Sequence, residues 1–303
     1  LLRSVFLADA APAGHDAAPA AEEALPPRGE PVLQLVDVTR RFGGIDAVSH
    51  VSFDVAAGEV LGLLGQNGAG KTTLFDLVSG YQSPDGGKVL FEGVDVTRWA
   101  PHRRAAAGLG RTFQGGRLFP GLTVTEAIAV SLERTAATRD PLNAALRLPA
   151  SQLSEARVWA RVEELLEVFG LAPYRDLFTS ELSTGTRRIV ELACAVGHQP
   201  SVLLLDEPAA GIAQREVEQL ARVLLRIRDE LGCALVVIEH DVPLLASIAD
   251  RLVALEAGQV IAEGGVAEVL ADPLVVASYL GNDPTAVERS GPTADAVTTG
   301  GMS

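Results

Sequence analysis

The chain has 303 residues, of which 48% are apolar and 21% charged, the balance of a globular protein with a sizeable core. Asp and Glu outnumber Lys and Arg by 39 to 25, and the net charge of −14 argues against broad electrostatic binding of nucleic acid or of anionic lipid. Because the sequence has no run of about 18 apolar residues, we expect no helix that crosses a bilayer.

The two ends of the chain are predicted to be disordered. Residues 8–31 are mainly Ala and Pro (14 of 24) and have no hydrophobic periodicity, a composition that cannot bury enough apolar surface to fold. We therefore expect a linker over residues 1–31, and a tail over residues 282–303, which are rich in Thr, Gly and Asp. The first residue is Leu, which motivates the hypothesis that the linker follows a membrane domain in a longer polypeptide.

Residues 32–281 alternate between strand and helix signals. Short apolar or β-branched runs predict strands at residues 32–38, 48–55, 59–64, 202–205 and 234–238. Between the last two strands, helical periodicity runs over residues 214–231 and ends before Gly232. A strand, a helix and a strand at this spacing form a parallel βαβ unit, so the sequence predicts an α/β fold with a mixed or parallel sheet.

Residues 65–72, which we name the phosphate loop, fit G-x-x-x-x-G-K-[ST] in full and lie between a predicted strand and a predicted helix. The backbone N–H groups of such a loop converge on phosphates at a helix N-terminus. Lys71 would reach the β- and γ-phosphates of a nucleotide, and the Thr72 hydroxyl would ligate Mg²⁺. The alternative is a glycine-rich turn that fits by chance, and the strand and helix on either side argue against it.

The middle of the chain has a different pattern, because residues 123–182 contain no strand signal. Thr123 and Glu126 have the spacing of a capping box at the start of a helix. From Ser154 to a stop at Gly170, apolar residues follow helical spacing on one face. We therefore predict a helical subdomain, over about residues 115–190, inserted in the α/β core.

Polar side chains follow the last two predicted strands. Asp206 and Glu207 come directly after residues 202–205, and His240 follows residues 234–238. Because open α/β sheets bind ligands at the carboxyl ends of their strands, we expect all three beside the phosphate loop. There Asp206 can hold Mg²⁺ through its water shell, and Glu207 can orient or deprotonate an attacking water. Taken alone, carboxylates at a strand end and a histidine after a strand are more often structural or surface residues.

Together these segments resemble the ABC transporter ATPase family over about residues 32–281. The resemblance implies an antiparallel β subdomain beside the main sheet and the inserted helical subdomain. Phe42 is similar to the aromatic residue that stacks on adenine, with a core Phe as the alternative. Gln114 is similar to the glutamine that contacts Mg²⁺ and the attacking water and links the site to the membrane partner. His240, at the same sheet edge, is expected to stabilise the charge on the transferring phosphate together with Lys71 and Mg²⁺.

Residues 182–186 (Leu-Ser-Thr-Gly-Thr) stand in the place of the family's signature segment. Ser183 and Gly185 match it, and in the family these positions contact the γ-phosphate bound to the other subunit of a head-to-tail dimer. Thr184 and Thr186 depart from the pattern, and Thr184 adds bulk where a glycine normally allows close approach. Ala213 is a further departure, because many relatives carry Asp or Asn there, and alanine cannot make that side-chain hydrogen bond.

The resemblance implies ATP and Mg²⁺ as cofactors. The residues expected to bind ATP are Phe42, Gly65, Asn67, Gly68, Ala69, Gly70, Lys71, Thr72, Thr73, Ser183 and Gly185. The residues expected to act in catalysis are Lys71, Gln114, Glu207 and His240. The residues expected to hold the metal are Thr72, Gln114 and Asp206.

The function that the resemblance implies is an ATP-hydrolysing subunit that powers a membrane transporter. Four segments are most similar to the ATPases of branched-chain amino-acid and urea importers: residues 111–120, 206–212, 238–241 and 275–281. The expected partners are a second cassette and transmembrane permease subunits or a fused membrane domain, at the cytoplasmic face of the membrane, with no nucleic acid.

Two alternatives stay open at this point. A non-transport ABC ATPase of the DNA-repair type would carry a long coiled coil, and one of the ribosome-binding type would carry two cassettes, whereas this chain has a compact insert and one phosphate loop. A regulatory cassette with weak hydrolysis is suggested by Thr184 and Ala213. Glu207 and His240 argue against that second alternative.

Overall fold

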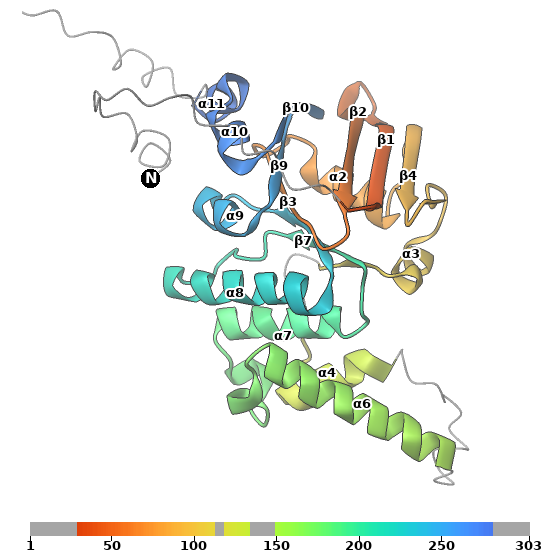
Figure 1. Ribbon diagram of the computed structural model, residues 1–303, viewed down its shortest axis with the longest axis vertical. Coiled ribbons are helices and arrows are strands. Elements are labelled where there is room, and N and C mark those ends of the chain that lie inside the picture. The colour runs from red at the N-terminus through yellow and green to blue at the C-terminus, as the bar shows by residue number, and fades with distance from the viewer. Residues whose placement is uncertain (1–28, 113–117, 134–148, 281–303) are drawn as a thin grey trace, which may run out of the picture.

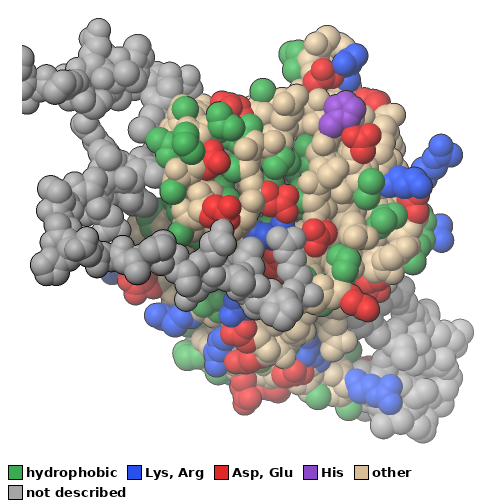
Figure 2. Space-filling view, turned by 45° about the horizontal axis from the view of Figure 1, so that its top comes forward, with side chains coloured by type: hydrophobic (Ala, Val, Ile, Leu, Met, Phe, Trp, Pro, Cys, Tyr) green, Lys and Arg blue, Asp and Glu red, His purple; other side chains and the backbone are tan. Residues whose placement is uncertain are grey.

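The computed structural model describes residues 29–112, 118–133 and 149–280. Gln114, most of the predicted linker and the predicted tail lie outside these described residues. On the face drawn in Figure 2, acidic side chains are spread over the surface, and basic side chains lie among them.

Two sheets form the framework of the fold (Figure 1). The first is antiparallel and has the order β2 (Ile45–Ala56), β1 (Pro31–Phe42), β4 (Gly86–Phe91), β5 (Val94–Asp95). The second has the order β10 (Gln259–Gly264), β9 (Arg251–Glu256), β3 (Val60–Leu64), β8 (Ala234–Ile238), β7 (Val202–Asp206), β6 (Leu109–Arg111). Five of these six strands are parallel, and β10 pairs antiparallel with β9. The predicted strands and the mixed α/β architecture are confirmed.

The strands of the second sheet are buried on both faces, and this explains their continuous apolar runs. Within β3, Val60 and Leu64 face a core shared with the helices, whereas Leu61 and Leu63 face a core shared with the antiparallel sheet. Helix α2 (Lys71–Ser79) packs in the second of these cores through its apolar side chains. The sheet is therefore held from both sides at the strand that leads into the phosphate loop.

Helices α8 (Gln214–Leu231) and α9 (Val242–Ile248) belong to the first core. The helix predicted over residues 214–231 is confirmed at both ends, and Gly232 closes it in a left-handed conformation with φ 63°. Two short helices, α10 (Val266–Ala271) and α11 (Pro273–Leu280), follow the last strand and lie beside β10 (Figure 1).

The helical part of the molecule consists of α4 (Val124–Leu132), α6 (Pro149–Val168) and α7 (Thr184–Val196), and Figure 1 places α4 and α6 far from the antiparallel sheet. The capping box is confirmed: the Glu126 N–H donates to Thr123 Oγ1 at 3.2 Å, and the Thr123 N–H donates to Glu126 Oε2 at 2.9 Å. Helix α6 begins at Pro149, five residues before the predicted start. Proline suits the first turn of a helix, where its missing N–H costs nothing.

A buried arginine joins the end of α2 to α3 (Pro101–Ala107). Arg104 is 1% exposed and donates to the carbonyl oxygens of Leu77 and Val78, both at 2.7 Å. It also donates to the carbonyl oxygens of Thr97 at 2.8 Å and Trp99 at 3.1 Å. Burial lowers the pKa of Arg104 to about 10. The guanidinium therefore holds the helix that begins in the phosphate loop to the rest of the core.

We expect Arg104→Met to lower the free energy of unfolding by roughly 3–5 kcal/mol, because it leaves buried carbonyl oxygens without a donor. Urea unfolding of the full chain measures the change. Arg103→Met is the matched control, since Arg103 is exposed and stacks over Trp99 at 3.9 Å, an interaction worth about 1 kcal/mol or less. Equal losses in the two variants would contradict this account.

Candidate functional site

The phosphate loop connects the end of β3 to the first residue of α2. Two of its glycines are required by geometry. A Cβ at Gly65 would lie 2.6 Å from the carbonyl oxygen of Leu255, and a Cβ at Gly70 would overlap the carbonyl oxygen of Ala47. Gly70 also has φ 101°, a backbone conformation that side chains rarely adopt. The loop can therefore pass close to neighbouring backbone and direct its own N–H groups toward a ligand.

The Lys71 side chain folds back over this loop. Lys71 is 6% exposed, and its ammonium donates to the carbonyl oxygens of Gly65 at 2.6 Å and Gln66 at 3.0 Å. Burial lowers the pKa of Lys71, and the negative charges of Glu207 and Asp206 oppose this shift. The structure thus brings the lysine and both carboxylates of the strand β7 end into electrostatic contact.

Asp206 and Glu207 occupy different environments at the end of β7. Asp206 is 4% exposed, and burial raises its pKa against the opposing charge of Arg111, whose Nη2 lies 3.8 Å from Asp206 Oδ2. Glu207 is half-buried, and its Oε1 lies 3.1 Å from His240 Nε2. Asp206 is thus a sheltered acceptor, while Glu207 and His240 form a pair that can exchange a proton with a nearby water.

Glu207 has a left-handed backbone conformation, with φ 49°. Such a conformation is costly for a residue other than glycine and persists where neighbouring contacts hold it. The Glu207 N–H donates to the carbonyl oxygen of Ile238 at 2.9 Å, and its own carbonyl accepts from the Ala210 N–H at 3.1 Å. The turn therefore directs the carboxylate away from the strand and toward the loop of His240.

Sequence reasoning missed Glu239, which links the loop that follows β7 to the loop that follows β8. This carboxylate is 4% exposed and accepts from the N–H of Ala209 at 2.6 Å and from the N–H of His240 at 3.1 Å. Burial raises the pKa of Glu239, and the hydrogen bonds from Ala209, His240 and Asp241 oppose the shift. The available signal was a carboxylate directly after five apolar strand residues, where an acidic side chain is buried only if backbone donors surround it.

Sequence reasoning also missed Arg111, at the end of β6. Its side chain is 8% exposed, and Nη1 donates to Asp76 Oδ1 at 2.6 Å and to Ser79 Oγ at 2.8 Å. These two partners lie on α2, and Asp206 lies on the neighbouring strand β7. Arg111 therefore ties the helix of the phosphate loop to the carboxylate of β7.

The signature segment lies at the N-terminus of α7 rather than beside the phosphate loop. Ser183 caps the helix by accepting from the Thr186 N–H at 3.1 Å, and its hydroxyl donates to Glu216 Oε1 at 2.9 Å. A Cβ at Gly185 would lie 2.7 Å from Glu216 Oε2. Ser183 and Thr184 are exposed. Within the described residues, Ser183 and Gly185 make no hydrogen bond to the phosphate loop.

The remaining candidate residues lie as follows. Phe42 ends β1, is 43% exposed, and has the guanidinium of Arg40 at 4.8 Å from its ring centre. Within the phosphate loop, Asn67, Gly68 and Thr72 are exposed and Ala69 is buried, and Thr73, which follows the loop, is half-buried. Gln114 lies outside the described residues.

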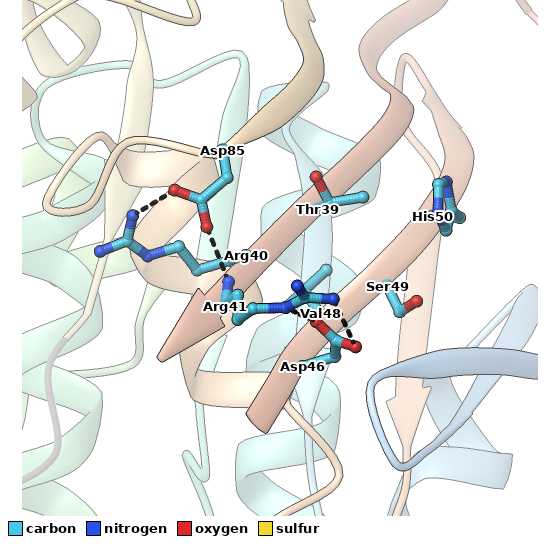
Figure 3. A pocket seen from close by; sticks show the side chains of 8 residues that line it. All are labelled: Thr39, Arg40, Arg41, Asp46, Val48, Ser49, His50 and Asp85. Carbon is cyan, nitrogen blue, oxygen red and sulfur yellow. Dashed lines mark hydrogen bonds and ion pairs between the residues drawn. The ribbon is translucent and has the colours of Figure 1, made fainter. Parts of the chain in front are cut away.

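A shallow pocket lies on the antiparallel sheet (Figure 3). The residues that line it are Thr39, Arg40, Arg41, Asp46, Val48, Ser49, His50 and Asp85. Its two arginines are already paired, Arg40 with Asp85 at 2.9 Å and Arg41 with Asp46. The pocket therefore offers no uncompensated charge to an anion, and it contains none of the residues expected to bind phosphate.

Two family models match the chain. A model described as "ABC transporter" matches residues 48–210, and one described as "Branched-chain amino acid ATP-binding cassette transporter" matches residues 259–284.

Two curated relatives match over most of their length. The high-affinity branched-chain amino acid transport ATP-binding protein BraF of Pseudomonas aeruginosa is 34% identical over 251 residues, which are 83% of this chain and 98% of the relative. The corresponding protein LivG of Escherichia coli K12 is 32% identical over 252 residues, again 83% and 98%.

Solved structures agree with these relatives. A nucleotide-free ATP-binding cassette from an ABC transporter is 29% identical and has a TM-score of 0.69, covering 82% of this chain and 98% of that one. The ADP conformation of an ATP-binding cassette of an ABC transporter gives the same identity and TM-score, covering 83% and 99%.

The contacts of Glu239 generate a prediction for Glu239→Gln. Ala209 donates to Oε1 and His240 to Oε2, so in glutamine the NH₂ group that replaces one of these oxygens faces an N–H donor instead of accepting from it. We expect turnover of ATP to fall by about 5- to 30-fold, the range for losing one buried hydrogen bond, while the dissociation constant for ATP changes by less than about 2-fold. Steady-state hydrolysis and equilibrium binding measure the two quantities.

Glu256→Gln is the matched control, because Glu256 is an exposed glutamate at the end of β9 in the same sheet. Wild-type turnover in Glu239→Gln, or equal losses in both variants, would show that Glu239 does not position the loops that follow β7 and β8.

Proposed function

The chain belongs to the ABC transporter ATPase family, and from this premise we propose that it is the ATP-hydrolysing subunit of an importer for branched-chain amino acids. Family membership confirms the resemblance seen in the sequence and the ATPase activity that it implied. The branched-chain substrate rests on the transport function of the relatives BraF and LivG and on the match of residues 259–284. The observation that carries the proposal is the convergence of Lys71, Asp206 and the Glu207–His240 pair at one edge of the sheet.

ATP would bind with its phosphates in the phosphate loop. The backbone N–H groups of residues 67–72 and the Lys71 ammonium supply positive potential at the N-terminus of α2. Phe42 would stack on adenine, which its exposure at the end of β1 permits. Lys71 would exchange its two carbonyl acceptors in the loop for phosphate oxygens, which carry a full charge and bind an ammonium more strongly.

The donors near the phosphate loop fit Mg²⁺. Thr72 presents an exposed hydroxyl and Asp206 a buried carboxylate whose pKa is raised by burial, a site that a cation would stabilise in its ionised form. Within the part of the chain that the structure describes, no cluster of three or more His, Cys, Asp or Glu could hold a metal by itself. Mg²⁺ usually binds to one or two protein oxygens, and water and phosphate oxygens complete its coordination shell. The ion would neutralise charge on the β- and γ-phosphates, and Gln114 is proposed as a further ligand.

Glu207 would orient the attacking water and accept its proton. His240 Nε2 is 3.1 Å from Glu207 Oε1, close enough to hold the carboxylate in place, and we propose that the imidazole donates to a γ-phosphate oxygen when it turns from Glu207. Hydrolysis in this family depends mainly on position and charge, so the backbone of Glu207 and the link through Glu239 serve the reaction by fixing where these groups stand.

A second cassette would complete each nucleotide site. Ser183 and Gly185 are proposed to contact the γ-phosphate held by the partner's phosphate loop, in a head-to-tail dimer. The exposure of Ser183 and its place at a helix N-terminus support this role, because the helix dipole favours an anion there. Thr184 and Ala213 lie on the same proposed interface and are both exposed.

Transmembrane permease subunits, or a fused membrane domain, are the proposed partners on the helical side. Phe119, Leu177 and Phe178 are between 41% and 66% exposed, and the Thr179 hydroxyl donates to the Phe119 carbonyl oxygen at 2.8 Å, which brings the two segments together. Among the described residues no helix is both long and apolar enough to span a membrane. We propose that this apolar surface docks the chain at the cytoplasmic face of the membrane.

Neither of the alternatives gains support. The relatives named above are transport proteins, and the contact between Glu207 and His240 is what hydrolysis needs rather than regulation without turnover.

Replacing the proposed base tests its role directly. We expect Glu207→Gln to keep ATP binding but to lower turnover by roughly 10²–10⁴-fold, the usual scale for the loss of a general base. Equilibrium binding and steady-state hydrolysis measure both effects. Wild-type turnover in this variant would remove Glu207 from the role.

The transport function is tested on the whole assembly. The chain is co-expressed with the permease subunits encoded beside it, purified from membranes, and placed in vesicles with the corresponding substrate-binding protein. We expect leucine, isoleucine or valine to stimulate ATP hydrolysis and to enter the vesicles, while an acidic amino acid does neither. Absence of stimulation by all three branched-chain amino acids would refute the proposed substrate.

A further inference from the structure

The C-terminal helix α11 makes side-chain contact with the start of the phosphate loop, across 214 positions of the sequence. The Gly65 N–H donates to the phenolic oxygen of Tyr279 at 2.8 Å. The adjacent Gln66 side-chain amide donates to the carbonyl oxygen of Ser278. From these contacts we propose that Tyr279 is a positioning residue for nucleotide binding, which holds the phosphate loop in its binding conformation.

The Gly65 N–H needs a partner because it is buried just beyond the end of a strand. The last ladder pairs of β3 are Leu63 with Ile238 on one side and Leu64 with Ala254 on the other. Gly65 comes after them and is buried, so its N–H has neither a strand partner nor open solvent. A buried N–H without an acceptor costs about as much as a lost hydrogen bond, and the Tyr279 hydroxyl supplies that acceptor.

Gly65 is held from its other side as well. Its carbonyl oxygen accepts from Lys71 Nζ at 2.6 Å, so one residue of the loop is bonded at its N–H by α11 and at its carbonyl by the lysine. The space around it allows no side chain, since a Cβ would lie 2.6 Å from the Leu255 carbonyl oxygen. The Tyr279 contact and the close Leu255 carbonyl therefore fix Gly65 without relying on Lys71, whose ammonium would turn to phosphate when ATP binds.

The position of Tyr279 is set by the core. On α11, Val275 is 1% exposed and belongs to the same core as Val269 of α10 and the helices α8 and α9. The Tyr279 side chain packs against this core, and burial raises its pKa, so the hydroxyl stays protonated at neutral pH. Packing holds the ring of Tyr279, and the Gly65 N–H donates to its phenolic oxygen, so the position of this oxygen is defined.

This inference rests on the proposed function, because it concerns the nucleotide site of that function. Without the Tyr279 hydroxyl, the loop populates conformations that cannot cradle phosphate, and ATP binds only to the remaining fraction. Affinity for nucleotide is therefore expected to fall, while the catalytic groups Glu207 and His240 keep their geometry.

The test is Tyr279→Phe in the full chain, which removes the hydroxyl and keeps the ring. We expect the dissociation constant for a fluorescent ATP analogue and the KM for ATP to rise between about 3- and 30-fold, the range that one lost partner of a buried N–H allows. The kcat at saturating ATP stays within about 2-fold. Amide exchange of the Gly65 N–H is expected to become faster by a similar factor.

Tyr174→Phe is the matched control, since Tyr174 is also partly buried against the core but lies in the helical part of the molecule. It should change neither KM nor exchange at Gly65. A general loss of folded protein would lower kcat and leave KM unchanged, so this pattern, or wild-type KM and exchange in Tyr279→Phe, overturns the inference.

Lys71→Ala separates this inference from the proposed function. If the wild type binds the ATP analogue and Lys71→Ala does not, the phosphate loop is the nucleotide site. If the wild type binds no nucleotide, the proposed function fails, and the rate of exchange at Gly65 in Tyr279→Phe still decides whether Tyr279 holds the loop.

Discussion

The register between β3, β8 and β7 brings the candidate catalytic residues Lys71, Glu207 and His240 to one edge of the sheet. Leu63 pairs with Ile238, and Ile238 pairs with Asp206, so the three strands end at the same level of the sheet. The residues that follow each strand are then neighbours by geometry, although Gly65 and His240 are 175 positions apart in the chain. Backbone hydrogen bonds in a buried parallel sheet cannot shift by one residue without moving apolar side chains out of both cores.

Placing charges at this edge creates a second requirement, because a buried ion is costly unless it is paired or hydrogen-bonded. The structure satisfies it in different ways. Lys71 is held by two carbonyl oxygens of its own loop, and Asp206 lies beside Arg111. Glu239 has only backbone N–H partners among its described hydrogen bonds, and these belong to the loops that follow β7 and β8. The hydrogen bonds that compensate the buried charges also fix the loops. A change that removes one of these bonds would therefore affect both the cost of burial and the positions of the loops.

The sequence was sufficient for features that depend on local pattern or on the shared edge of parallel strands. It was insufficient for single side-chain contacts between other distant segments. Apolar runs predicted the buried strands, and Gly232 and the Thr123–Glu126 capping box predicted helix ends, because strand burial and helix capping are local effects. The start of α6 was misplaced because helix ends carry weak signals.

Long-range contacts left no such trace. Arg111 meets Asp76 and Ser79 across more than 30 positions, and Tyr279 meets Gly65 across 214. In the sequence each is one polar residue among apolar neighbours. Only the fold shows which carbonyl, carboxylate or N–H it meets, and therefore which part of the site it supports.

The contacts of Ser183 within this chain bear on its proposed role in a nucleotide site shared by two subunits. A serine hydroxyl has one proton to donate, and in this chain it is given to Glu216 Oε1 at 2.9 Å. Donation to a phosphate oxygen would require the hydroxyl to leave this carboxylate, whose negative charge lies beside Gly185 as well. In the proposed dimer, assembly of two subunits around ATP would therefore exchange one acceptor for another, and an exchange of similar hydrogen bonds has a small net free energy. Such a balance suits a dimer that has to open again after each hydrolysis.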